Sequence, residues 1–205
     1  MYGIPDNCII NKPLYKKAVL EKFNLKSTEC DRFDADVSRM AIVAYVSPSK
    51  IPALHPGQDV KDFYVLQVQL KKKDYDTKNI LLLQKLIPQK IVFALEFDEE
   101  VQFCIFHTRL QQSEWKHASE ANITLKGLTF DDIWNNFVAE IGGLDNTVEE
   151  TLEQQIINRE EREKLLRQIG MLEKRCRQEK QTRKKYELHQ QLLKLKEQII
   201  YEENR

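Results

Sequence analysis

Apolar and polar side chains alternate along residues 65–73, VLQVQLKKK. Alternation with a period of two is typical of a β-strand whose two faces meet different surroundings. The predicted apolar face carries Leu66, Val68 and Leu70, and the polar face carries Val65, Gln67, Gln69 and Lys71. We therefore expect a strand over residues 63–72, and its polar face is the first place to look for function.

Three further segments are rich in β-branched and aromatic residues, which favour strands. They are MAIVAYV at 40–46, IVFALEF at 91–97 and VQFCIFHTRL at 101–110. The second is almost wholly apolar, which indicates a strand that is covered on both faces. A turn at DEE makes the third segment the antiparallel hairpin partner of the second.

Two helices are predicted before the first of these strands. The first begins near Asn11, which can cap it, with Pro13 in its first turn. Its buried side carries Leu14, Val19, Leu20 and Phe23. In the second helix Ser27 or Thr28 can serve as the cap, and Thr28 and Asp31 have the spacing of a capping box.

A third helix has clear boundaries at 130–141. Thr129 can cap it with support from Asp132, and Ile141-Gly142-Gly143 ends it, with glycine available for the left-handed conformation that ends a helix. Leu128 and Ile133 hold the positions of a hydrophobic staple. Elsewhere, residues 77–88 predict a short helix, and residues 47–62, with three prolines and a glycine, predict a long loop.

The composition changes after Gly143, where charged residues dominate and Asn146 to Glu149 resemble the start of a new helix. Apolar residues then recur at coiled-coil spacing in two runs: Leu165, Ile169, Leu172 and Cys176, then Leu188, Leu192, Leu195 and Ile199. No apolar seam residue joins the runs between Arg177 and Lys185. We interpret this as an antiparallel helical hairpin that turns near residues 178–182; one long helix is the alternative.

These elements predict an α+β fold, with a mixed sheet of four or five strands, packed helices and a C-terminal helical hairpin or coiled coil. We expect an α+β domain at residues 1–143 and the helical part at residues 144–205.

Charge and cysteine content limit the kinds of binding surface and the cellular compartment that we expect. The 205 residues hold 32 Lys and Arg and 32 Asp and Glu, so a nucleic-acid surface must be local. Cys8, Cys30, Cys104 and Cys176 form no CxxC pair, which favours reduced thiols in the cytosol. With no predicted signal peptide and no apolar run of membrane-spanning length, we expect a soluble cytoplasmic protein without membrane contact.

The triplet Gln69-Leu70-Lys71 resembles in its placement the acid-x-Lys triplet of Mg²⁺-dependent PD-(D/E)xK nucleases. In such sites carboxylates hold Mg²⁺ and a lysine stabilises charge or positions water. Gln69 offers only a neutral amide oxygen, strand 40–46 carries no acid, and Asp74 and Asp76 follow the strand. We favour an ordinary half-buried strand; a nuclease, active or degenerate, that uses Lys71 and Gln69 is the alternative.

A basic run near the predicted turn is the second candidate site. It consists of Lys174, Arg175, Arg177, Lys180, Arg183, Lys184 and Lys185, and Glu179 is the one acid among them. At the tip of a hairpin, such a run can neutralise phosphates with little sequence preference. The alternative is the solvated charged surface that is usual for coiled coils. Tyr186 is the one aromatic residue beside it that can stack on a base.

No metal or nucleotide site emerges from the remaining residues. Cys104 and His107 are three positions apart on a strand and therefore point to opposite faces. His55, His117 and His189 are scattered, and there is no phosphate-binding glycine loop or Ser-His-Asp pattern. We expect Cys104 in the core, Trp134 buried in its helix, and Trp115 either packed or exposed as a contact residue.

Three phrases together resemble an uncharacterised bacterial family of domains of unknown function. They are VLQVQLKKKD, LLLQKLIPQKIVFALEF and LEKRCRQEKQTRKKYELHQQLLKLK, joined by SEW at 113–115. The resemblance implies a genomic setting and no activity. Members of the family are encoded beside helicases and DNA methyltransferases in phage-defence or restriction-like loci.

We therefore expect a non-catalytic accessory or interaction subunit of a bacterial DNA-targeting defence or restriction-like system. Its partners would be a helicase or methyltransferase, by the resemblance, and DNA or RNA through the basic run. The alternatives are the nuclease, which alone would need Mg²⁺, and a homodimeric coiled-coil scaffold. No other cofactor is expected.

Overall fold

The computed structural model describes residues 1–22, 25–145, 147–148 and 150–203. It divides into two compact units, Met1–Leu152 and Glu153–Arg205. The domain boundary at residues 143 and 144 stays a prediction. None of the helices in the described ranges is both long enough and apolar enough to cross a membrane.

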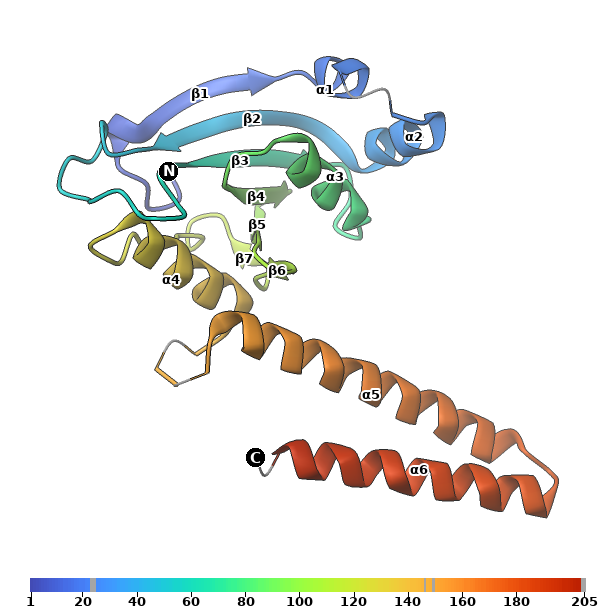
Figure 1. Cartoon of the computed structure of the whole chain (residues 1–205). Helices are drawn as coiled ribbons and strands as arrows, with labels where there is room; N and C mark the ends of the chain where they lie inside the picture. Colours follow the sequence, from blue (N-terminus) through green and yellow to red (C-terminus); the bar gives the residue numbers. More distant parts are fainter. Residues whose placement is uncertain (23–24, 146, 149, 204–205) are drawn as a thin grey trace. The chain divides into compact units, whose positions relative to one another are not determined.

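The first unit is built on a mixed sheet, as predicted, but its described part has seven strands instead of four or five. Their order is β1-β2-β3-β4-β5-β6, with β7 on β5, and β3 and β4 form the one parallel pair. The strands are β1 (Ile9–Leu14), β2 (Val37–Val46), β3 (Phe63–Leu70), β4 (Ile91–Phe97), β5 (Glu100–Phe106), β6 (Leu110–Gln112) and β7 (Lys116–His117). The helices are η1 (Asp6–Cys8), α1 (Lys16–Lys22), α2 (Ser27–Asp36), α3 (Lys78–Leu86) and α4 (Phe130–Gly142). Figure 1 shows β1 to β3 side by side.

The segment VLQVQLKKK lies at the centre of this sheet, because β3 pairs with β2 on one side and β4 on the other. Its apolar face joins a core with residues of α2 and α3, including Phe33, Ile80 and Leu83. On the other face Phe63 contacts three aromatic rings of α4, those of Phe130, Trp134 and Phe137. Both faces of β3 are therefore packed at its start, and polar side chains occur only toward its end.

The predicted first helix is wrong at its beginning. Residues 9–14 form β1, an edge strand paired with β2, and α1 starts only at Lys16. Asn11 has a positive φ of 45° at a register shift, and Pro13 is tolerated because an edge strand leaves one side without partners. Pairing with β2 overrides the local signals for a helix cap. Val19 is buried, Leu14 and Leu20 are half-buried, and Phe23 lies outside the described residues.

Two smaller predictions also fail. Helix α2 begins at Ser27, and Glu29 accepts a hydrogen bond from the backbone N–H of Lys26, so Thr28 and Asp31 do not form the capping box. The segment 101–110 is not one strand, because β5 ends at Phe106 and β6 begins at Leu110. Tight turns and cap choices depend on tertiary contacts that local spacing does not reveal.

Helix α4 begins at the predicted residue and ends at Gly142, one residue beyond the predicted end. Thr129 and Asp132 form the capping box, and Gly143 ends the helix in the left-handed conformation, with φ of 59°. The staple is wrong, since the side chain of Leu128 is 77% exposed. Trp134 is buried, as predicted.

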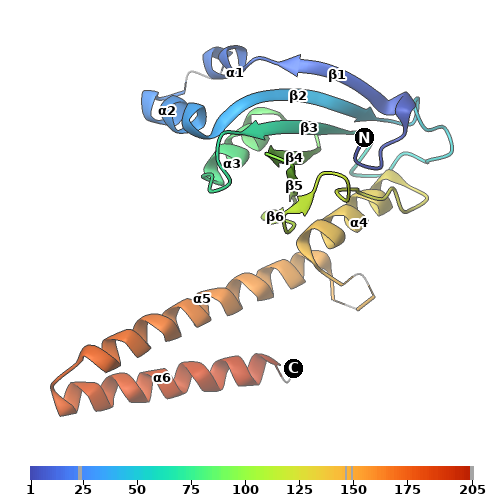
Figure 2. The ribbon, with the colours of Figure 1, turned by 180° about the vertical axis from the view of Figure 1, so that it is seen from behind.

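The second unit confirms the helical hairpin. α5 (Leu152–Gln178) and α6 (Thr182–Glu203) run antiparallel side by side in both views (Figures 1 and 2). Ile169, Leu192 and Ile199 are buried between them, with Leu165, Leu172 and Leu195 packed around. The turn at residues 179–181 rules out the single long helix. The helix predicted from Asn146 begins at Leu152, and Asn146 and Glu149 lie outside the described residues.

Candidate functional site

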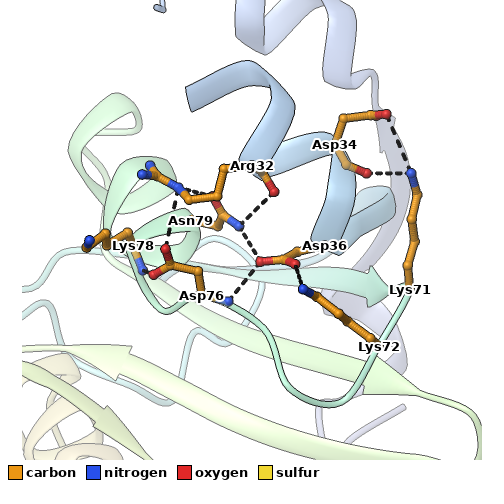
Figure 3. Close-up of polar contacts among 8 residues, drawn as sticks. All are labelled: Arg32, Asp34, Asp36, Lys71, Lys72, Asp76, Lys78 and Asn79. Carbon is orange, nitrogen blue, oxygen red and sulfur yellow. Dashed lines mark hydrogen bonds and ion pairs between the residues drawn. The ribbon is translucent and has the colours of Figure 1, made fainter. Parts of the chain in front are cut away.

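Lys71, the candidate catalytic lysine, directly follows β3 and is held by α2 (Figure 3). Its Nζ lies 3.5 Å from Oδ2 of Asp34 and also donates a hydrogen bond to the backbone carbonyl of Asp34. Lys16 approaches the same carboxylate from α1. Hydrogen bonding and charge from Lys16, followed by the charge of Lys71, lower the pKa of Asp34. Lys71 is therefore one of two ammonium groups that neutralise a single carboxylate.

The next lysine, Lys72, contacts a buried acid that the sequence reasoning missed. Its Nζ lies 2.9 Å from Oδ1 of Asp36, whose side chain is only 2% exposed at the end of α2. The other oxygen of Asp36 accepts hydrogen bonds from the backbone N–H of Asp76 (2.8 Å) and from Nδ2 of Asn79 (2.7 Å). Burial by itself would raise the pKa of Asp36, but the hydrogen bonds from Lys72, Asp76 and Asn79 outweigh it and lower the pKa.

Arg32 completes this cluster between α2 and the start of α3. Its Nε donates to Oδ1 of Asn79 at 3.2 Å and lies 3.7 Å from Oδ2 of Asp76. The other carboxylate oxygen of Asp76 accepts the backbone N–H of Lys78 (Figure 3). The group therefore ties the end of β3 to α2 and α3, and both oxygens of Asp36 are already engaged within the chain.

The polar face of β3 is covered in part by the N-terminal turn. Tyr2 donates its hydroxyl hydrogen to the carboxylate of Glu96, which lies on β4 beside Gln69. Burial and the bond to Glu96 raise the pKa of Tyr2, while a hydrogen bond with Gln67 opposes that shift. Gln67 and Gln69 are half-buried. These contacts within the chain give the polar face a structural role, whereas the nuclease alternative for Lys71 and Gln69 stays a prediction.

Metal-binding residues do not gather in the described ranges, where no group of three or more His, Cys, Asp or Glu side chains could hold an ion. Cys104 is fully buried in the core, as predicted, and burial raises its pKa to about 12 despite contacts with Tyr75 and Gln112. His107 lies beyond the end of β5. Trp115 is half-buried against Tyr75 and under Nζ of Lys73, so the packed alternative is confirmed.

The long loop at residues 47–62 is fastened to the start of α4. The carboxylate of Asp131 accepts the backbone N–H groups of Gln58 (2.5 Å), Asp59 (3.2 Å) and Val60 (2.7 Å). A Cβ on Gly57 would lie 2.3 Å from Oδ1 of Asp131, so glycine is required for this close approach. The sequence reasoning missed Asp131, although an acid in the first turn of a helix was a visible signal.

The basic run lies at the tip of the hairpin, as predicted: at the end of α5, in the turn and at the start of α6. All seven cations of this basic tip, defined as residues 174–185, are exposed. Among the described side chains, Arg183 is the one of the seven with an ion pair, to Glu187 at 3.3 Å. Arg177 helps to lower the pKa of Glu173, after the larger effect of Lys196. Oε1 of Glu179, the one acid of the basic tip, accepts the backbone N–H of Gln181 at 2.8 Å.

The two sites predicted from the sequence, Lys71 and the basic tip, lie in different units. Lys71 and its neighbours are engaged by acids of the first unit, whereas the basic tip presents its cations to solvent. An exposed set of cations with few acidic partners can bind a polyanion.

No curated protein and no solved structure matches the chain. A family described as "Domain of unknown function (DUF4391)" matches residues 2–199. Because that match covers nearly the whole chain, the protein belongs to this DUF4391 family.

Proposed function

We propose that this protein is a non-catalytic interaction module that binds nucleic acid through the basic tip of its helical hairpin. Exposure of all seven cations, with a single ion pair among them in the described residues, is the observation that carries the proposal. Its α+β unit would dock a protein partner. The setting that we propose is an accessory role in a bacterial DNA-targeting defence or restriction-like system, beside a helicase or methyltransferase.

The distribution of charge supports this proposal. The basic tip has seven cations and one acid, a net charge of +6, in a chain whose total is zero. The rest of the chain therefore carries a net charge of −6. A polyanion would be repelled by most of the molecule and attracted at one end of the hairpin, which restricts binding to that end.

The hairpin also supplies a stable base for this surface. Its apolar seam is buried between α5 and α6 of the same chain, so the basic tip is formed without a second copy. Glu173 and Lys196 add a cross-helix ion pair of 2.8 Å. Fixed helices hold the cations near one another, and this reduces the conformational entropy lost when they meet phosphates.

A binding titration with matched charge changes tests the proposal. Arg183, Lys184 and Lys185 changed together to Glu lower the net charge by 6, since each reversal contributes −2. Fluorescence anisotropy with labelled DNA and RNA at low salt should show affinity reduced at least about a hundredfold. The control changes three exposed lysines of the first unit, Lys12, Lys17 and Lys61, to Glu, with the same net charge. Equal losses in both variants, or no binding by the wild type, would refute the proposal.

The non-catalytic part has its own test. Plasmid and linear DNA are incubated with the protein in Mg²⁺ and in Mn²⁺, beside Lys71→Ala. We expect intact DNA in every sample, because Lys71 is engaged by Asp34 and the neighbouring Gln69 is not an acid. Cleavage by the wild type that Lys71→Ala abolishes would establish the nuclease alternative instead.

A further inference from the structure

We infer that the ligand of the basic tip is double-helical DNA, with the tip in the major groove and its cations on the phosphates of both strands. This inference rests on the proposed nucleic-acid binding and specifies the form of the ligand. It follows from the directions in which the cations point around the two helices.

On α5, two arginines point to opposite sides of the hairpin. Successive residues of a helix are rotated by about 100°, so Arg175 and Arg177 are separated by about 200°. They lie on either side of the direction in which Leu165, Ile169 and Leu172 face α6. The two arginines therefore project from the two flat flanks of the hairpin, and Lys174 points to its outer edge.

On α6, two consecutive lysines are also divided by the apolar seam, although they are separated by only about 100°. Lys184 and Lys185 lie on either side of the line of Leu192, Leu195 and Ile199. The ion pair between Glu173 and Lys196 identifies the matching flanks of the two helices. One flank therefore carries Arg177 and Lys185, and the other carries Arg175 and Lys184. Arg183 points to the outer edge, and Lys180 lies in the turn.

The thickness of the hairpin fits this arrangement to one groove. Between its flanks the hairpin is one helix thick, about 10–12 Å with side chains. The major groove of B-form DNA is about 12 Å wide and admits one layer of this size. If the tip enters the groove with its two flanks facing the two strands, each flank directs one pair of cations toward the phosphates of one strand. No base-specific contact is implied, because all four flank residues would contact the backbone.

The other nucleic acids fit less well. The major groove of A-form RNA is deep and narrow, and side chains cannot read it. Single-strand binders rely on a groove along one backbone and on aromatic side chains that stack on bases. Four cations of the basic tip lie on opposite flanks, and only Tyr186, 65% exposed, adjoins it as an aromatic residue.

The inference is tested by anisotropy titrations of the whole chain with three labelled probes of one sequence. They are a DNA duplex of roughly 21 base pairs, its single strand and the corresponding RNA duplex. We expect the DNA duplex to bind at least about tenfold more tightly than either other probe. Equal or tighter binding of the single strand or the RNA duplex would overturn the inference and leave nucleic-acid binding itself intact. Absence of binding to all three would refute the proposed function.

Two charge-matched variants test the flank geometry. Arg175→Gln with Lys185→Gln removes one cation from each flank, and Lys174→Gln with Arg183→Gln removes two cations from the outer edges. The flank variant should reduce the slope of log affinity against log salt by about 1.8, and the edge variant by less than half as much. Circular dichroism serves as the check that both variants keep their helices. Equal reductions would show attraction without a groove and overturn the inference.

A modified duplex tests the groove directly. Glucosylated hydroxymethylcytosine fills the major groove and leaves the phosphates unchanged, since the cytosine C5 position faces that groove. Affinity should fall by more than about tenfold. Unchanged affinity would place the contact elsewhere on the duplex and overturn the inference.

Discussion

The two lysine-rich segments of this chain, residues 71–73 and the basic tip, look alike in sequence and differ in their surroundings. Lys71, Lys72 and Lys73 each have an acidic partner in the first unit, namely Asp34, Asp36 and Glu100. In the basic tip, seven cations share one ion pair among the described residues. A run of lysines therefore indicates a binding surface only when the fold leaves the charges unmatched.

The difference arises from how each segment is supported. The lysines at 71–73 follow a central strand, where α2 and β5 bring acids from distant parts of the sequence. The basic tip closes a two-helix hairpin, and its neighbours in space are mainly its neighbours in sequence. The first arrangement stabilises the fold, and the second leaves charge available to a ligand.

The largest effect on stability is expected from removing the acid that partners Lys72. Asp36→Ala leaves the buried amide of Asn79 and the N–H of Asp76 without their acceptor. We expect the free energy of unfolding to fall by about 2–4 kcal/mol. Urea denaturation followed by tryptophan fluorescence measures this, because both tryptophans, Trp115 and Trp134, lie in the first unit.

Asp34→Ala is the matched control, since it removes the acid beside Lys71, and the side chain of Asp34 is 59% exposed. Asp34→Ala should lower the free energy of unfolding much less than Asp36→Ala does, because solvent screens an exposed ion pair. Similar losses in both variants would contradict the structural role assigned to Asp36.

A smaller effect is expected from pH. The pKa of Asp36 is lowered in the folded state, so its ionised form stabilises the fold above the unfolded pKa of about 3.9. That contribution is lost as pH falls through the folded value. The difference in unfolding free energy between wild type and Asp36→Asn should therefore be constant near neutrality and shrink below about pH 4. A difference that grows on acidification would contradict the lowered pKa.

The smallest effect on stability is expected at the basic tip. Changing Lys180, Lys184 and Lys185 to Gln should alter the free energy of unfolding of the hairpin by no more than about 0.5 kcal/mol. These side chains are exposed and like-charged, so the change removes no favourable pair. Circular dichroism during thermal unfolding measures the change. A large destabilisation would mean that the cations serve the fold instead of a ligand.

The sequence predicted the regular parts of the molecule well, because their signals are local. Alternation identified β3, continuous apolarity identified β4, and seam spacing identified the hairpin. It failed where distant segments decide the outcome. Pairing with β2 turned residues 9–14 into a strand, although Asn11 and Pro13 looked like a helix start.

The candidate sites divide in the same way. The basic tip was visible because its residues are close in sequence. The partner of Lys72 was not, because Asp36 lies on another element and meets Asp76 and Asn79 only after folding. The loop-fastening role of Asp131 likewise depends on backbone groups more than seventy residues away.

The most direct test compares the two lysine-rich segments by DNA binding, with three charges removed from each. One variant changes Lys71, Lys72 and Lys73 to Gln, and the other changes Lys180, Lys184 and Lys185 to Gln. The salt dependence of duplex binding is then measured for both variants and the wild type. We predict an unchanged slope for the first variant. For the second, the slope should fall by about 1 for each phosphate that a lysine no longer neutralises. A reduced slope for the first variant with an unchanged slope for the second would contradict the account.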